Sequence, residues 1–336
     1  MNLELDTSYI KATLAPILHL LEDDNVNEVA INPLELGTGI VWVKLGNGNW
    51  QQALSKTGDL ITLDNTKLQQ IISFMSGSND KITHDKRPIL ECSIPLLGYR
   101  FTGVMQPASI GCHIFNIRKF STTLYTFEDY VKQGLFLPEY IEVIREWQKN
   151  NFSIAIVGGV DSGKTTFICS FIEEKRKLNP DECWVVLEDT KELRIREGNI
   201  RRLLTTNQVT MDDHLKVMLR LTPDQTVVGE VRGKEAYTAL KLMQTGKPVI
   251  FSMHANSVDR ALVRFEHMCL EHNEVDKISR QEIANSLTGI ISIQKETYKT
   301  VQDGQIIVGF KRKVTGIREV IGYDDEFNKY AYRDVL

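Results

Sequence analysis

Short continuous apolar runs, separated by segments with helical spacing, dominate the second half of the chain. The runs lie at residues 153–157, 184–187, 226–228 and 249–251. A strand that is apolar on both sides is typical of a parallel sheet covered on both faces. The alternation with helical segments therefore predicts a doubly wound α/β sheet. Past Leu287, further strand-like stretches indicate an antiparallel extension.

The first 118 residues mix strand-like and helical stretches and contain no glycine-rich phosphate loop. Apolar residues between Leu68 and Met75 fall at helical spacing. Asp64 is expected to cap that helix and Gly77 to end it. This part is therefore predicted to be a smaller mixed α/β domain.

Residues 119–137 turn polar and are interpreted as a linker between a domain over 1–118 and a second domain over 138–336. Inside the linker, Thr126 and Asp129 have the spacing of a capping box, which predicts a short helix.

Length and composition are those of an ordinary soluble globular protein. The chain has 336 residues, of which 42% are hydrophobic and 25% charged, and this length fits about two domains. No apolar run approaches the ~18 residues of a membrane helix, and the polar start lacks the order of a signal peptide. The five cysteines are scattered, which predicts free thiols in a reducing, cytoplasmic compartment.

The charge balance disfavours sequence-specific binding to nucleic acid. The formal net charge is −4, from 40 basic and 44 acidic residues, whereas binding to nucleic acid relies on clustered cations. The dense basic runs at 175–177 and 311–313 are short, so they are interpreted as solvated faces.

One octet gives the strongest chemical signal. Residues 158–165 read GGVDSGKT and match the phosphate-loop pattern G-x-x-x-x-G-K-[ST] after a buried strand and before a helix. Glycines let successive N–H groups turn toward anionic oxygens, and the helix presents its positive end to them. Lys164 can reach the β- and γ-phosphates, and the Thr165 hydroxyl can bind Mg²⁺.

The sequence thus predicts a nucleotide site. The residues predicted to contact the nucleotide in this segment are Gly158, Gly159, Val160, Asp161, Ser162, Gly163, Lys164, Thr165 and Thr166. A GTPase would need an Asn-Lys-x-Asp motif, and the nearest string, at residues 328–331, lacks the aspartate.

Acids and a histidine follow the later strands. Residues 188–192 (EDTKE) end the second apolar run, Glu230 ends the third, and His254 follows the fourth. Because the carboxyl ends of parallel strands line the ligand crevice, these groups are expected to lie beside the phosphate loop. Acids there can hold Mg²⁺ or orient water, and a histidine can contact the γ-phosphate.

Taken together, these segments resemble the secretion and pilus traffic ATPases, most closely the hexameric ATPases of type IV secretion and conjugation systems. VGGVDSGKTT is similar to the Walker A motif of that family, LEDTKEL to its acidic box, LRLTPDQTVVGEVRG to its Walker B stretch, and SMHAN to its histidine box. Upstream, NEVAIN, VWVKLGNGNW, RPIL, GYRFTGV and NIRK resemble its first domain. The resemblance implies a RecA-like P-loop NTPase domain preceded by a PAS-like α/β domain.

The resemblance also implies individual roles. Lys164 and Thr165 match the phosphate and magnesium residues. Glu192 matches the acid thought to polarise water, Glu230 the Walker B glutamate beside Mg²⁺, and His254 the histidine-box residue. The implied catalytic residues are therefore Glu192, Glu230 and His254.

Four arginines match nucleotide-binding positions of the family. Arg100 and Arg118 match arginines of the first domain that close over the nucleotide. Arg220 and Arg232 match arginines near the subunit boundary, where one protomer completes the site of the next. Such residues would stabilise transition-state charge.

Three positions depart from the family pattern. Asp161 stands where glycine is common, Thr222 where arginine is common, and Lys247 in place of a histidine. A carboxylate at position 161 must face away from the phosphates or weaken their binding. The lack of a four-cysteine cluster argues against the type II secretion branch.

The resulting expectation is an ATP-hydrolysing, Mg²⁺-dependent ring motor, a homo-oligomer and by resemblance a hexamer. It would act with other components of a secretion apparatus at the cytoplasmic face of the inner membrane, with peripheral membrane contact only. ATP would bind between the domains, and hydrolysis would swing the first domain about residues 119–137. The alternatives are a nucleotide-gated scaffold with negligible hydrolysis, a pilus extension or retraction ATPase, and a nucleic-acid helicase.

Overall fold

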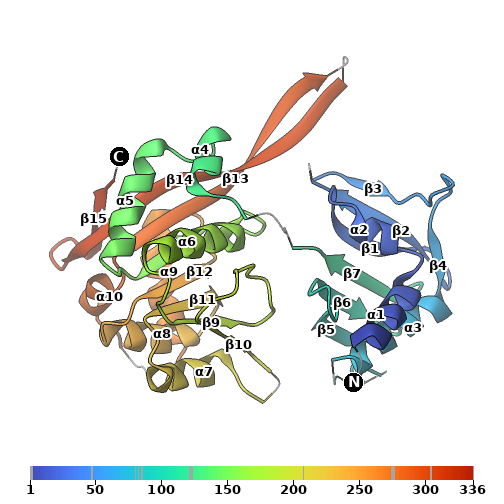
Figure 1. Ribbon diagram of the computed structural model, residues 1–336, viewed down its shortest axis with the longest axis horizontal. Coiled ribbons are helices and arrows are strands. Elements are labelled where there is room, and N and C mark those ends of the chain that lie inside the picture. Colours follow the sequence, from blue (N-terminus) through green and yellow to red (C-terminus); the bar gives the residue numbers. More distant parts are fainter. Residues whose placement is uncertain are drawn as a thin grey trace. The chain divides into compact units, whose positions relative to one another are not determined.

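The computed structural model describes residues 3–46, 48–79, 81, 83–84, 86–120, 124–206, 208–273, 277–302 and 305–335. The chain divides into two compact units, Met1–Ser121 and Thr122–Leu336, which are coloured blue to teal and green to red in Figure 1.

This division differs from the predicted linker over 119–137. Phe127, Tyr130 and Phe136, which belong to that segment, are buried in the core of the second unit. Their rings lie 5.8, 5.6 and 6.0 Å from the ring of Phe167. The aromatic residues of this otherwise polar segment therefore fold it onto the second unit.

The first unit contains an antiparallel sheet that packs with helices in one hydrophobic core. The sheet has the strand order β3-β2-β1-β7-β6-β5, with β4 also paired to β2. Its strands are β1 Val26–Glu35, β2 Thr38–Leu45, β3 Trp50–Gln52, β4 Thr62–Asp64, β5 Ile89–Ser93, β6 Arg100–Val104 and β7 Ile114–Arg118. Its helices are α1 Leu3–Leu14, α2 Leu18–Glu22 and α3 Asn65–Gly77.

Local rules account for helix α3. The Asp64 side chain accepts the N–H of Lys67, and the helix ends at Gly77, so both predicted boundaries are confirmed. Leu68 and Ile71 from this helix pack with Phe101 of β6 in the core of the first unit.

The second unit contains a mixed eight-stranded sheet in the order β10-β9-β11-β12-β8-β13-β14-β15. The pairs from β10 through β13 are parallel, and β14 and β15 continue antiparallel, as the sequence predicts. The strands are β8 Ile154–Val157, β9 Trp184–Glu188, β10 Ile200–Leu204, β11 Gln225–Val231, β12 Val249–Met253, β13 Gly289–Gln302, β14 Gln305–Asp324 and β15 Lys329–Asp334.

Helices cover both faces of this sheet (Figure 1). They are α4 Phe127–Lys132, α5 Pro138–Lys149, α6 Lys164–Leu178, α7 Met211–Met218, the short 3-10 helix η1 Leu219–Leu221, α8 Glu235–Gln244, α9 Val258–Leu270 and α10 Arg280–Ser286. In β8, Ile154 and Ile156 join the core beneath α5 and α6. Ala155 and Val157 join the core beneath α8 and α9, so the strand is buried on both faces.

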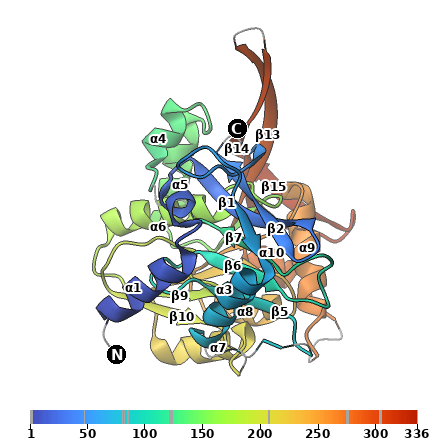
Figure 2. The same ribbon diagram turned by 90° about the vertical axis from the view of Figure 1, so that its right-hand side faces the viewer.

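Strands β13 and β14 form a long two-stranded ribbon that extends beyond the rest of the second unit (Figures 1 and 2). Only residues 289–292 of β13 pair with β8, whereas its whole length pairs with β14. Directly after the part that pairs with β8, Ile293 of this ribbon lies against the turn that follows β8.

Candidate functional site

The predicted phosphate loop, residues 158–163, joins β8 to α6 at the carboxyl edge of the parallel strands. Gly163 has a φ of 96°, in the left-handed region that favours glycine. A Cβ atom at Gly158 would lie 2.1 Å from the carbonyl oxygen of Ile293 and 2.5 Å from Ser162 Oγ. Glycine is therefore required at both ends of the loop, at one for its torsion angle and at the other for close packing.

Several hydrogen-bond donors of the loop have no partner among the described residues. Within the described part of the chain, the backbone N–H groups of Gly159, Val160 and Gly163 donate no hydrogen bond, and the buried Ser162 hydroxyl has no partner. Unpaired N–H groups at the start of a helix form a binding site for phosphate. The loop therefore fits a nucleotide.

Lys164 begins α6 and is only 7% exposed. Its Nζ donates to the carbonyl oxygens of Gly158 at 3.1 Å and Gly159 at 2.9 Å. The same atom lies 3.4 Å from His254 Nδ1. The ammonium group is thus held at the loop by two backbone carbonyls and lies beside His254.

Glu230 and His254 lie together at the ends of neighbouring strands. His254 Nε2 is 2.7 Å from Glu230 Oε1, and Glu230 Oε2 accepts hydrogen bonds from Arg232 Nε and Nη2 at 2.8 and 2.6 Å. The buried Ser252 hydroxyl, which sequence reasoning missed, donates to the Gly229 carbonyl at 2.6 Å and ties β12 to β11 beside them. Strands β11, β12 and β8 therefore bring Glu230, His254 and Lys164 into one line of contacts.

The guanidinium group of Arg232 lies beside the carboxylates of Glu230 and Asp189. Its Nη1 lies 3.4 Å from Asp189 Oδ2. Burial of the guanidinium lowers its pKa, but the hydrogen bonds that it donates to Glu230 and the charges of Glu230, Asp189 and Glu192 outweigh that effect and raise the pKa of Arg232. Arg232 therefore stays charged and orients the acids at this edge.

The buried Glu188 carboxylate fixes the backbone of the acidic segment that follows β9. Glu188 is 2% exposed, and its Oε1 accepts the N–H groups of Glu192 at 2.8 Å and Leu193 at 2.6 Å. Its Oε2 accepts Arg202 Nη2 at 2.7 Å. Arg202 belongs to β10, a strand that the sequence pattern does not predict. Glu188 therefore positions the half-buried Glu192.

The remaining predicted arginines belong to other elements of the fold. Arg220 is exposed in η1. Arg100 and Arg118 are directly opposite each other on β6 and β7 of the first unit, and Glu28 is opposite Arg118 on the other side. Like charges in such a pair are unfavourable without a nearby anion, and the Glu28 carboxylate of the neighbouring strand lies 2.9 Å from Lys44 Nζ.

The Asp161 side chain lies against the β13–β14 ribbon. Its Oδ1 is 2.9 Å from Arg312 Nη2, and its Oδ2 is 3.2 Å from Lys295 Nζ. The interpretation of residues 311–313 as a solvated face is therefore wrong for Arg312. A carboxylate inside a phosphate loop was the signal that a nearby cation was needed.

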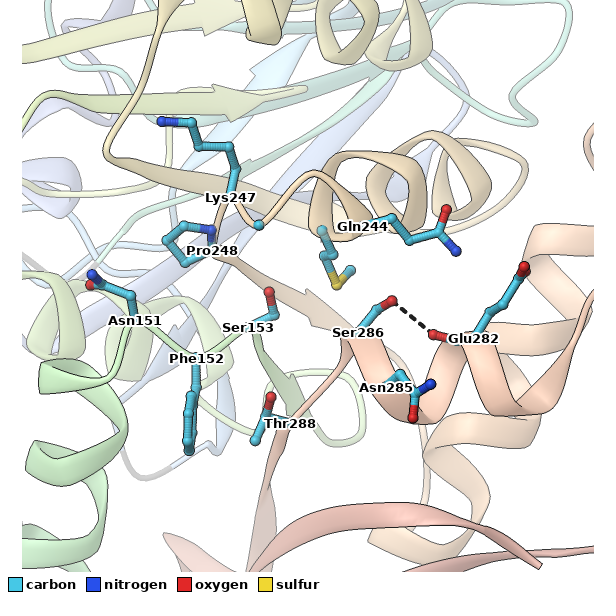
Figure 3. A pocket seen from close by; sticks show the side chains of 12 residues that line it. Asn151, Phe152, Ser153, Gln244, Lys247, Pro248, Glu282, Asn285, Ser286 and Thr288 are labelled. Atoms are coloured by element: carbon cyan, nitrogen blue, oxygen red, sulfur yellow. Dashed lines mark hydrogen bonds between the residues drawn. The ribbon is translucent and has the colours of Figure 1, made fainter.

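A separate pocket of ≈ 420 Å³ opens at the opposite, amino edge of the sheet (Figure 3). Ser153, Pro248 and Thr288 line it from just before β8, β12 and β13, and Lys247 lies beside them. The departure at Lys247 is therefore at the edge away from the phosphate loop.

Fold and site together define a P-loop α/β protein, and comparison with known proteins names its family. The family model described as type II/IV secretion system protein matches residues 70–306. The chain belongs to this family.

Two relatives cover most of the chain. The conjugal transfer protein TrbB of Rhizobium radiobacter is 31% identical over 277 residues, which are 82% of this chain and 81% of the relative. The type IV secretion system protein VirB11 of Brucella suis is 24% identical over 327 residues, which are 87% of this chain and 86% of the relative.

Solved structures agree with the fold. The pilus retraction motor PilT with bound ADP has a TM-score of 0.61 at 18% identity and covers 90% of this chain and 82% of its own. The ATPase DotB of Legionella pneumophila has a TM-score of 0.60 at 17% identity, with coverage of 93% and 81%. In the described residues of our chain, we find no helix with the length and apolar character needed to cross a membrane.

Proposed function

We propose that this protein is a Mg²⁺-dependent ATPase that energises a type IV secretion or conjugation apparatus. The observation that carries the proposal is the line of contacts from Lys164 through His254 to Glu230, next to a loop with unpaired N–H groups. The relatives named for conjugal transfer and type IV secretion support the choice of apparatus.

The residues at the loop suit ATP and Mg²⁺. Lys164 can exchange the two loop carbonyls for β- and γ-phosphate oxygens, and the Thr165 hydroxyl and Glu230 would hold Mg²⁺. Among the described residues, no group of three or more His, Cys, Asp or Glu side chains could hold a metal ion by itself. Mg²⁺ binds through few protein groups together with phosphates and water, and Thr165 and Glu230 would be those groups.

The acids and histidine would then act on the attacking water. Glu230 and Glu192 carry the negative charge that can orient and polarise it, and His254 lies between Glu230 and the Lys164 ammonium, where it can contact the γ-phosphate. Arg232 holds the Glu230 carboxylate in one orientation. Positioning and charge stabilisation of this kind account for most of the catalysis of phosphoryl transfer.

The proposal extends to the assembly. The second unit would be RecA-like and the first PAS-like, in a hexameric ring in the cytoplasm with peripheral contact at the inner membrane. Arg100 and Arg118 would supply positive charge from the first unit, and Arg220 and Arg232 would contribute at the boundary between subunits. The exposed position of Arg220 supports such a role.

Phosphate release from Mg-ATP tests the proposed activity. We expect wild-type turnover well above background, none in Lys164→Ala, and nucleotide binding without turnover in Glu230→Gln, because the carboxylate acts on water and metal rather than on the loop. Lys241→Ala, at an exposed lysine of α8, is the matched control and should keep wild-type turnover. Background release by wild type, or normal turnover by Lys164→Ala, would contradict the proposal.

A further inference from the structure

Asp161 stands in the middle of the phosphate loop and contacts the ribbon through both carboxylate oxygens and its backbone oxygen. Arg312 Nη2 is 2.9 Å from its Oδ1, Lys295 Nζ is 3.2 Å from its Oδ2, and Arg312 Nε donates to its backbone oxygen at 3.0 Å. Asp161 has a φ of 59°, which aspartate tolerates better than most residues. The ribbon therefore holds both the charge and the backbone of this residue.

Lys295 and Arg312 together bind the Asp161 carboxylate. Lys295 and Arg312 are directly opposite each other in the β13–β14 register, an arrangement that is unfavourable for like charges. The ring of Phe310 offsets part of the repulsion, since Lys295 Nζ and Arg312 Cζ lie 3.9 and 4.7 Å from its centroid. Asp161 supplies the negative charge.

Arg312 also covers the end of the loop. A Cβ atom at Gly163 would lie 3.0 Å from Arg312 Cδ, so the apolar stem of Arg312 packs on the residue before α6. Arg312 therefore contacts the loop at Asp161 and at Gly163, on either side of the buried Ser162.

We propose that Arg312, assisted by Lys295, is a positioning residue of the phosphate loop and sets its affinity for nucleotide. Paired with the ribbon, Asp161 no longer opposes the phosphates, and the unpaired loop N–H groups keep their direction. Without Arg312, the carboxylate would be freer to face the nucleotide and repel it. This inference rests on the proposed nucleotide binding.

Equilibrium binding of the fluorescent nucleotide mant-ADP tests the inference without requiring turnover. We expect Arg312→Ala to weaken binding about tenfold, the change produced by roughly 1.4 kcal/mol. Asp161→Asn removes the charge and keeps a side chain suited to positive φ, so the double variant should return to within about threefold of wild type. Lys311→Ala, an exposed neighbour on β14, is the control and should bind normally.

Each other outcome has one meaning. Unchanged binding by Arg312→Ala, or a double variant as weak as the single one, would overturn the inference, since Arg312 would then be dispensable or would act by itself. If Arg312→Ala does not fold by thermal melting, Lys295→Ala with the same Asp161→Asn rescue decides, with the same two failures. If wild type does not bind mant-ADP, the proposed function fails and the inference fails with it.

Discussion

Helix α6 carries a buried lysine at each end, and their surroundings differ. Lys164, its first residue, donates to two carbonyls of its own loop. Lys175, in the last turn, is 1% exposed and donates to the Gln148 carbonyl at 2.6 Å and Asn151 Oδ1 at 2.8 Å. Glu182 Oε1 lies 3.4 Å from its ammonium group.

The helix dipole distinguishes a structural lysine from the lysine that we propose binds nucleotide. A positive charge at the carboxyl end of a helix is favourable, whereas one at the amino end opposes the helix dipole. Lys175 obeys this rule, and its ammonium group lies among acceptors at Gln148, Asn151 and Glu182. Lys164 violates it, beside N–H groups that have no partner in the described chain. A local cost of this kind is expected where an anion is to be bound.

Replacing each lysine by methionine should give the largest difference in unfolding free energy between the two ends of helix α6. Lys175→Met leaves buried acceptors unpaired and should lower the free energy of unfolding by about 2–4 kcal/mol. Lys164→Met should change it by less than about 1 kcal/mol, because it also removes an unfavourable charge from the helix start. Urea unfolding measures both, and equal losses would show that the two lysines have the same structural role.

Asn151→Gly should give a smaller effect at the carboxyl end of the helix. Asn151 has a φ of 54°, which glycine adopts without strain, so this change removes the side-chain acceptor shared by Lys175 and Gln225 without straining the folded backbone. We expect a loss of about 1–2 kcal/mol. In the double variant with Lys175→Met, the loss of unfolding free energy should be smaller than the sum of the two single losses. Full additivity in urea unfolding would mean that Asn151 does not act through Lys175.

The sequence sufficed wherever a short pattern determines the structure. The Thr126–Asp129 capping box and the Asp64 cap are present, and Glu230 and His254 lie at the carboxyl ends of parallel strands, at the edge where the loop after β8 begins, as predicted. These features depend on neighbours in the chain or on the general geometry of parallel sheets. Their positions therefore followed from one sequence.

The sequence did not suffice where distant segments meet. Lys175 and Arg312 were interpreted as parts of solvated basic runs, yet one is buried against residues near position 150 and the other binds a loop 151 positions away. β10 was missed because its Arg-Arg sequence looks unlike a strand, although Arg202 pairs with the buried Glu188. Such partners are chosen by tertiary packing, which the local pattern does not contain.

Binding of mant-ATP in the presence of Mg²⁺, measured side by side on wild type, Lys164→Met and Lys175→Met, tests the central claim most directly. We expect that folded Lys175→Met binds as wild type does, whereas Lys164→Met loses at least about tenfold in affinity. Wild-type affinity in Lys164→Met would contradict the claim that the triphosphate binds at the amino end of α6.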